Sequence, residues 1–238
     1  MIDTNKFAEA TIDRALTSPI AGEYDPTPRY SASSIGFCDR KLYYKKQGTP
    51  GLEHIPFDAE CRMKVGTLIG DIVQKRLLHH NAEAAEEVVI PPIEIEPREV
   101  EQVLGEEAHF SKTQYCSLKL DAFVPCPQDE AMDFIVEVKS GGRRLLTALL
   151  PSYYKMQTGV YWRALWTKWV YFILVDRAVF AHKWVHLEDP KLSWKEALRV
   201  INLIEYHINV VGKPPPRPMH LGRRMCSSCG YFHLCYKG

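Results

Sequence analysis

The chain has 238 residues, of which 46% are hydrophobic and 25% are charged, values that are ordinary for a soluble globular protein with a sizeable core. Its formal net charge is only +1, so overall charge gives no support to nucleic-acid binding, which would depend on local basic clusters. No apolar run approaches the length of a membrane span, and the first residues do not form a signal peptide. We therefore expect no membrane partner and a cytoplasmic protein, either in a prokaryotic cell or, if the gene is viral, in its host.

Three helices are predicted in the first third of the chain. A short helix spans residues 5–16, within a lead-in that ends at residue 30. Residues 31–34 include three serines, which are good N-caps for a second helix that contains Cys38 and stops at Gly48. The third helix spans residues 57–78, where apolar residues recur at steps of three or four: Val65, Leu68, Ile69, Ile72, Val73 and Leu77.

A β-hairpin is predicted at the centre of the chain. Residues 117–124 and 133–139 alternate apolar and polar side chains, and the loop between them is rich in proline and acidic residues. Centring that loop near residue 129 places Asp121 opposite Glu137, Ala122 opposite Val136, and Lys119 opposite Lys139. Side chains alternate between the faces of a sheet. One face therefore carries Leu118, Leu120, Ala122, Val136 and Val138, and the other carries Asp121, Glu137 and Lys139.

The two carboxylates of this hairpin suggest a metal site. On directly opposed strands they would lie about 5 Å apart and would repel one another unless a cation lay between them. Oxygen ligands suit Mg²⁺ or Mn²⁺, which also keep waters available for chemistry. Lys139, on the same face as Glu137, could orient such a water or stabilise a developing negative charge. The alternative is an exposed strand face on which charged residues happen to alternate.

The elements around the hairpin are predicted from shorter patterns. Residues 88–95 contain two short strand pieces, which give an extra antiparallel strand or a hairpin. Two glycines and then Arg143 and Arg144 follow Lys139, and this basic turn is a candidate phosphate contact. A helix over 152–166 places Gln157 and Tyr161 on one face, where they could bind a phosphate or stack on a base, or could merely pack within a partly buried helix.

The last regular elements are a second hairpin and a long helix. Residues 169–175 and 178–185 form the hairpin, and a capping box from Ser193 to Glu196 opens a helix that ends near residue 211. The order of strand pair, helix, strand pair and helix predicts a mixed α/β core.

Cysteines cluster near the C-terminus of the chain. Cys226, Cys229 and Cys235 are separated by two and then five residues, and in a cytoplasmic chain such a cluster indicates metal binding rather than disulfides. Three thiolates lack the fourth that tetrahedral zinc or a cubane cluster normally needs. Zinc bound by cysteines alone, or by three cysteines together with His233, stays an alternative to an iron–sulfur cluster. Arg223 and Arg224, just before the cluster, are candidate contacts to a nucleic-acid backbone. We expect the other cysteines to be buried or incidental: Cys61, Cys116 and Cys126.

The central hairpin resembles the metal site of the PD-(D/E)xK nuclease superfamily, and a Gln-x-x-x-Tyr pair on the next helix is a motif of its RecB-type members. Asp121, Glu137 and Lys139 match the superfamily, although residue 120 is leucine where the family has proline. The resemblance implies a restriction-endonuclease-like core, with a central mixed sheet flanked by helices. It also implies that Asp121, Glu137 and the Val138 carbonyl hold Mg²⁺ or Mn²⁺. Lys139 would then position the attacking water, and Gln157 and Tyr161 would position the phosphate or the strand.

The cysteine spacing resembles the iron–sulfur subgroup of RecB-like nucleases, which includes the CRISPR-associated Cas-four exonucleases and the AddB nuclease domain. The resemblance implies that Cys38 is the fourth ligand of a [4Fe–4S] cluster that clasps both ends of the chain. The chain then divides into a lead-in over 1–30, a nuclease core over 31–213 and a cysteine segment over 214–238. Within the core, the helix over 31–48 supplies the first cluster cysteine.

One position departs from the family, which often has a metal-binding histidine four residues after a helix glycine. Here Gly70 follows Gly66, and Asp71 or Gln74 is the candidate substitute.

We expect a metal-dependent deoxyribonuclease that hydrolyses phosphodiester bonds, acting as an exonuclease on single-stranded DNA ends. The alternative is a catalytically silent DNA-binding or adaptor subunit of a CRISPR-adaptation or recombination complex, so DNA and the proteins of such complexes are the expected partners.

Overall fold

The computed structural model describes residues 20–21, 29–51, 54–55, 57–80, 85–86, 89–125, 133–147, 149–166, 169–187, 189–217, 226 and 229–236. The predicted helix over residues 5–16 lies outside these residues, as do Cys126, Arg223 and Arg224.

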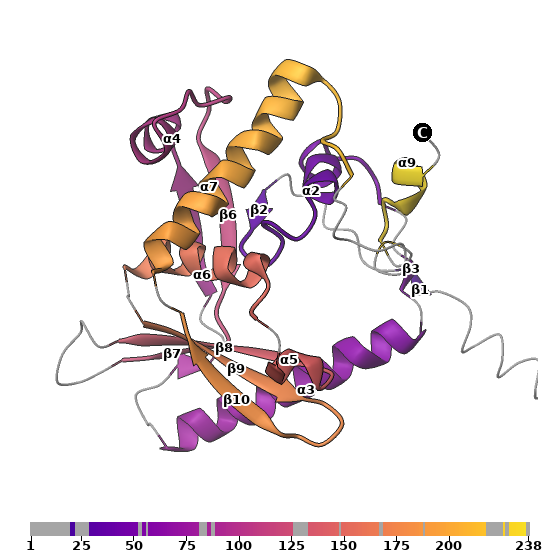
Figure 1. The fold of residues 1–238 in the computed structure, drawn as a ribbon, viewed down its shortest axis with the longest axis vertical. Coiled ribbons are helices and arrows are strands. Elements are labelled where there is room, and N and C mark those ends of the chain that lie inside the picture. The colour runs from indigo at the N-terminus through magenta and orange to yellow at the C-terminus, as the bar shows by residue number, and fades with distance from the viewer. Residues whose placement is uncertain are drawn as a thin grey trace, which may run out of the picture.

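A five-stranded mixed sheet forms the middle layer of the molecule (Figure 1). Its strands lie in the order β10-β9-β8-β7-β4, and only the β8–β9 pair is parallel. The parallel pair requires a crossover, which helix α6 provides. The strands are β4 (Ala85–Glu86), β7 (Ala122–Val124), β8 (Phe134–Gly141), β9 (Trp169–Asp176) and β10 (His182–His186).

A second, three-stranded sheet rises from the first, because β6 runs directly into β7 (Figure 1). Its order is β2-β6-β5, with β2 parallel and β5 antiparallel to β6. A separate short pair joins β1 to β3. These strands are β1 (Ile20–Ala21), β2 (Tyr30–Ser31), β3 (His54–Ile55), β5 (Val89–Ile95) and β6 (Gln114–Lys119).

Helices cover both faces of the five-stranded sheet. In Figure 1, α6 and α7 lie above the sheet and α3 lies below it. The helices are α2 (Asp39–Lys46), α3 (Phe57–His80), α4 (Pro97–Leu104), α5 (Arg144–Thr147), α6 (Ser152–Leu165), α7 (Pro190–Tyr206) and α9 (Phe232–Tyr236), and α7 continues as the π-helix η2 (His207–Val211).

Two hydrophobic clusters lie on the two faces of the five-stranded sheet. The larger cluster packs α6 and α7 against the second sheet and includes Ile135, Val160 and Trp194. The smaller cluster joins α3 to the other face of the five-stranded sheet through Ala122, Val124 and Val136. Because side chains alternate along β8, Ile135 and Glu137 face α6 whereas Val136 faces α3. The mixed α/β architecture with flanking helices is therefore confirmed.

The central hairpin has the predicted register, but its first strand is broken. Ala122 pairs with Val136 as predicted. The chain leaves the strand conformation at Leu120 and Asp121, so residues 114–119 belong to one sheet and residues 122–124 to the other. The predicted continuous apolar face is wrong for this reason: Leu118 and Leu120 lie in the larger cluster and the other members lie in or against the smaller one.

Two further predictions need correction. Cys38 is the N-cap of α2 and not part of its first turns. Helix α7 begins at Pro190, because Asp189 accepts the Leu192 N–H at 2.8 Å, so Ser193 lies inside the helix and does not cap it. The extra antiparallel strand predicted within residues 88–95 is confirmed: β5 pairs antiparallel with β6, with an irregularity between Ile90 and Ile93, where the two prolines cannot donate ladder hydrogen bonds.

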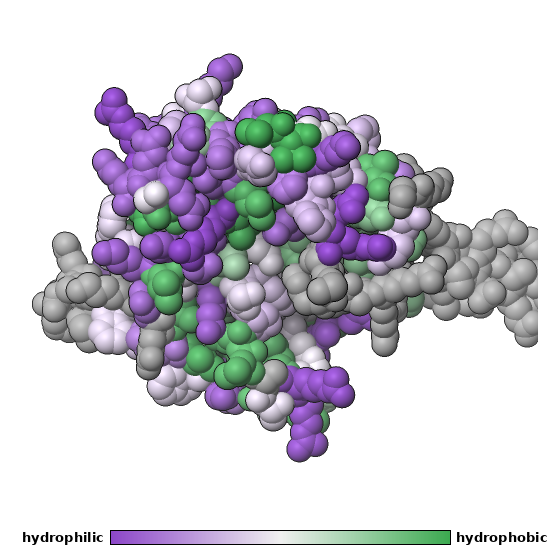
Figure 2. Space-filling model, turned by 45° about the horizontal axis from the view of Figure 1, so that its top comes forward, coloured by the Kyte–Doolittle hydropathy of each residue, from purple (hydrophilic) through white to green (hydrophobic). Residues whose placement is uncertain are grey.

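The surface combines polar regions with isolated apolar ones. On the face of the molecule drawn in Figure 2, hydrophilic residues dominate the area over α4 and α7. The predicted apolar stripe of α3 is only half covered, since Ile69 is 5% exposed whereas Leu68 and Ile72 are 59% and 49% exposed. In the part of the chain that the structure describes, no helix combines the length and the hydrophobicity that a membrane span requires.

Candidate active site

Asp121 lies at the junction of the two sheets. Strand β7 begins one residue later, so β8 has no strand partner opposite Val138 on that side. The Asp121 carboxylate takes the place of the missing strand, because its Oδ2 accepts the Val138 N–H at 2.7 Å. The break in the strand thus fixes this carboxylate beside β8.

Glu137 projects from β8 into the space beneath α6 and is 3% exposed. Its Oε1 accepts hydrogen bonds from the Lys139 ammonium and, at 2.9 Å, from Gln157 Nε2. Its Oε2 accepts one from the Tyr161 hydroxyl, also at 2.9 Å. Three donors from two elements therefore hold one buried carboxylate.

Gln157 and Tyr161 do not lie where the predicted contact with a phosphate or a strand would require. They are 4% and 0% exposed, and Gln157 also donates to the Tyr161 hydroxyl at 2.5 Å. The Tyr161 hydroxyl in addition lies 3.0 Å from the Lys119 carbonyl, at the end of β6. The pair therefore positions Glu137 from the interior of the protein, because neither side chain keeps a solvent-facing surface that a nucleic acid could contact.

The pKa of the Glu137 carboxyl is unusually high for a glutamate. Burial raises its pKa to about 7, while the Lys139 charge lowers it and the Asp121 charge raises it. The two acidic groups are thus close enough to repel one another, as expected for a pair of divalent-metal ligands. Lys139 is 18% exposed on its side chain, so the site opens to solvent at the lysine.

The carboxylates fit a divalent cation in their chemistry. Asp121, Glu137 and the Val138 carbonyl are all hard oxygen donors, and a bound cation would offset the repulsion between the two carboxylates. Gly70 has room for a side chain, because no atom outside its own helix lies within 4 Å of an added Cβ. Of the two candidate substitutes, Gln74 is buried and Asp71 is partly exposed. The predicted phosphate contacts Arg143 and Arg144 are both exposed beside the site.

The cysteine segment packs near the start of α2. Tyr231 stacks on Tyr44 with ring centroids 5.5 Å apart. Burial raises the pKa of the Cys38 thiol, and the neighbouring thiols of Cys229 and Cys235 raise it further. Cys226 acts in the same way on Cys235. The four predicted cluster ligands therefore gather from both ends of the chain.

These four thiols do not lie close enough together to form a metal site in this structure. Among the described residues, no three histidine, cysteine, aspartate or glutamate side chains are grouped so that they could hold a metal ion. One feature nevertheless fits an anionic group at this place: the Nε of Arg40 is buried without a hydrogen-bond partner among the described residues, and the charges of Cys38 and Cys235 act on Arg40. Of the other cysteines, Cys116 is buried and Cys61 is exposed.

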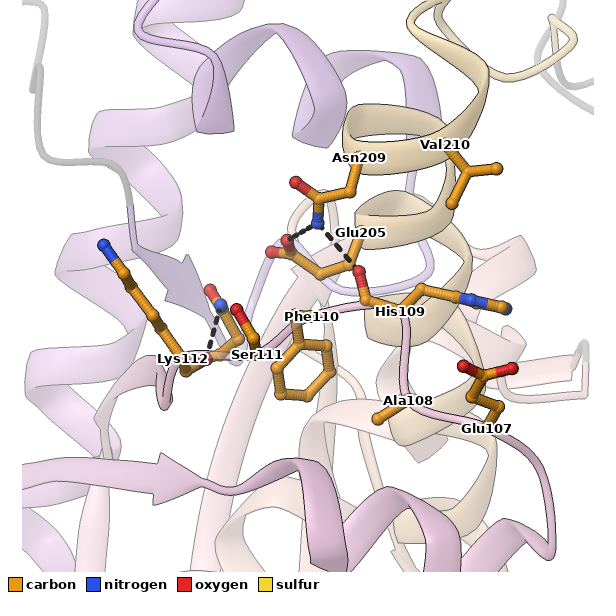
Figure 3. Close-up of a pocket in the computed structure, with 10 residues that line it drawn as sticks. Glu107, Ala108, His109, Phe110, Ser111, Lys112, Glu205, Asn209 and Val210 are labelled. Atoms are coloured by element: carbon orange, nitrogen blue, oxygen red, sulfur yellow. Dashed lines mark hydrogen bonds between the residues drawn. The ribbon is translucent and has the colours of Figure 1, made fainter.

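A cavity of about 620 Å³ lies apart from these groups, between residues 107–112 and the end of α7 (Figure 3). Strand β6 separates it from the carboxylates, since Gln114 at one end lines the cavity and Lys119, about 17 Å away, adjoins Asp121. Beside the cavity, buried Glu205 accepts hydrogen bonds from Tyr30 at 2.8 Å and from Asn209 at 3.2 Å and pairs with Lys46 at 3.7 Å. Sequence reasoning missed this network, because its members are up to 175 residues apart.

Of the comparisons with known proteins, only the one with solved structures gives matches, and the first of these shows a likeness of fold alone. No family model matches the chain, and no curated protein matches it. Among solved structures, that of SSO0001 matches with a TM-score of 0.54 and 14% identity, covering 99% of this chain and 96% of the other. Two structures of LHK-Exo, an alkaline exonuclease from Laribacter hongkongensis, match with TM-scores of 0.47, for the complex with dAMP, and 0.45. Each has 13% identity and covers 78% of this chain and 92% of the other.

Proposed function

We propose that this protein is a divalent-metal-dependent deoxyribonuclease. The observation that carries the proposal is the buried Glu137 carboxylate, held by Lys139, Gln157 and Tyr161 and coupled to the charge of Asp121. A purely structural core would gain nothing from burying an acid that its neighbour repels. A site that binds Mg²⁺ or Mn²⁺ would make use of both carboxylates.

The reaction is the addition of water across a phosphodiester. The water oxygen bonds to phosphorus, the ester P–O bond breaks, one water proton passes to solvent, and the leaving oxygen acquires a proton. When bound, the cation would lower the pKa of water and offset charge on the phosphate. Asp121, Glu137 and the Val138 carbonyl would hold it, while Lys139, at the open side of the site, orients the attacking water.

We propose a [4Fe–4S] cluster as the second cofactor, held by Cys38, Cys226, Cys229 and Cys235. The thiols approach from both ends of the chain, and the unpartnered Arg40 Nε gives an anionic cluster a buried donor. The cysteines would have to draw together to hold the cluster. Its role would be structural. Iron and sulfide analysis of anaerobically purified protein, with visible absorbance, tests the cluster, and zinc in a colourless protein would reject it.

The nuclease is tested by incubating the protein with end-labelled linear single-stranded DNA and Mn²⁺. We expect the wild type to degrade the DNA and the Lys139→Ala variant to leave it intact. The size ladder then separates exonuclease from endonuclease cleavage. Equal degradation by both proteins would reject the role of Lys139.

One observation favours the alternative of a silent DNA-binding or adaptor subunit. Gly70 supplies no ligand where the resembling family often has histidine, and no side chain of the described residues lies within 4 Å of its Cβ position. If the protein with its metals loaded binds single-stranded DNA but does not cut it, the adaptor function replaces the nuclease.

A further inference from the structure

A row of three aromatic rings leads away from the proposed active site. It starts at Tyr154, whose ring centroid lies 5.1 Å from Lys139 Nζ. The ring of Tyr153 follows edge-on, with centroids 4.5 Å apart, and Phe37 meets Tyr153 edge-on at 5.3 Å. The row therefore connects the catalytic lysine with a residue more than a hundred positions away in the sequence.

Close packing fixes the two halves of this row against each other. Phe37 ends the turn before α2, whereas the tyrosines occupy the first turn of α6. The turn approaches α6 so closely that a Cβ on Gly36 would lie 3.5 Å from the Tyr153 Cα and 2.4 Å from the Met156 sulfur. The rings are thus held in place before any ligand binds, which reduces the entropy lost on binding.

The three rings are neither core residues nor freely exposed ones, since all are of intermediate exposure. Tyr154 is supported from below by the fully buried Phe172, with the two rings inclined by 30° and 5.8 Å apart. Burial raises the pKa of Tyr153 to about 12, so its phenol stays neutral. The row carries no negative charge that would repel a phosphate, and the cation of Lys139 stands at its end.

We propose that Phe37 and Tyr153 form a nucleobase-stacking platform that holds the bases of single-stranded DNA next to the scissile phosphate, while Tyr154, which packs between Phe172 and Lys139, links the platform to the active site. The inference rests on the proposed nuclease function and deepens it by naming residues that would bind the substrate bases. Aromatic side chains bind bases of any sequence through their faces, and those faces are accessible in a single strand but covered in a duplex. The platform would therefore select single-stranded or frayed ends and would not select a sequence.

The platform is tested by DNA binding without cleavage. In a Glu137→Gln background, we compare Tyr153 and Tyr153→Leu proteins by fluorescence anisotropy, using a dye-labelled oligothymidylate and an abasic strand of the same length and charge. We expect the leucine variant to bind the normal strand roughly tenfold more weakly, as for the loss of one stacking ring, and the abasic strand equally well. Equal weakening on both strands, or no weakening on the normal strand, would overturn the platform.

Two controls separate the platform from folding and from the nuclease function. Trp184→Leu removes an aromatic ring that is 67% exposed on β10 and should change neither affinity. If the tyrosine variant does not fold, photo-crosslinking of the Glu137→Gln protein to an iodouracil strand needs no platform substitution. Crosslinks at Tyr153 or Phe37 support the platform, and crosslinks only elsewhere overturn it. If the wild-type protein cuts no DNA, the nuclease function fails and the platform with it, whereas a wild type that cuts DNA, together with tight, base-independent binding by the Glu137→Gln protein, rejects the platform alone.

Discussion

Gln157 Nε2 donates to Glu137 Oε1 at 2.9 Å and thereby ties helix α6 to strand β8. Tyr161, one helical turn further on, holds the other oxygen of the same carboxylate and reaches the Lys119 carbonyl as well. A single face of α6 thus fixes the carboxylate on β8 and contacts the end of β6. Because Glu137, Gln157 and Tyr161 are all buried, this face of α6 sets the geometry of the proposed metal ligand without touching a substrate.

Tyr161→Phe should weaken divalent-metal binding about 10- to 100-fold, as is typical when a group that orients a metal ligand is removed. The substitution deletes one hydroxyl and leaves the ring packing unchanged. Mn²⁺ titration of cleavage rate measures the effect. The rate at saturating metal should recover substantially, whereas the Lys139→Ala rate should not. An unchanged metal dependence would show that the hydroxyl serves only the fold.

The stability of the metal-free protein should depend on the ionisation of Glu137. Its pKa is raised from 4.5 to about 7 by burial. The protonated form is therefore favoured in the folded state, and stability that is fully present below pH 4.5 is lost as the pH rises through about 7. By linkage the loss amounts to about 3 kcal/mol.

Urea denaturation of metal-free protein between pH 5 and pH 8 measures this loss, with Glu137→Gln as the matched variant. The glutamine cannot ionise, so its stability should lack this component of the pH dependence. Mn²⁺ should restore stability at pH 8 to the wild type and much less to the variant. Parallel pH profiles of the two proteins would contradict the assignment.

Cys229→Ser should abolish the visible absorbance of anaerobically purified protein and lower its melting temperature, because a structural cluster contributes directly to folding. Cys61→Ser is the control, since Cys61 is exposed on α3 and is not one of the proposed ligands. Loss of colour in both variants, or in neither, would contradict the proposed ligand set. The Arg40→Leu variant should retain iron but lose it faster in air, because the buried donor is gone.

The sequence was informative where a local pattern decided the structure. The hairpin register followed from alternation and from a loop of turn residues, and Ala122 indeed faces Val136. Helix α4 could have been predicted as well, because Pro97 stands at its first position and Gly105 adopts the left-handed conformation that ends it.

What the sequence did not reveal depends on contacts between distant segments. Nothing local marks Leu120 and Asp121 as the point where one strand divides between two sheets. The spacing of Gln157 and Tyr161 placed them on one face of a helix, but only the docking of α6 on β8 shows that this face points at Glu137 and not at solvent. The aromatic row likewise combines residues 37 and 153, which no periodicity links.

Among glycine-to-alanine changes within helices, we expect Gly159→Ala to destabilise the protein most. An added Cβ would lie 2.3 Å from the Trp194 backbone nitrogen and 2.4 Å from the Ser193 carbonyl carbon. Both are backbone atoms of α7, so no side chain can rotate away, and the two helices must separate. We expect a loss of about 3 kcal/mol in the free energy of unfolding.

The same change should also reduce activity, because Gly159 lies between Gln157 and Tyr161 and any shift of α6 moves both away from Glu137. Gly70→Ala is the matched control: its Cβ position is clear of other atoms for 4 Å, and alanine favours the helix by about 1 kcal/mol. Urea denaturation and the cleavage rate are measured on both variants. If Gly159→Ala is as stable as the wild type, the close α6–α7 contact is wrong. If it is unstable but fully active at low temperature, Glu137 does not depend on the position of α6.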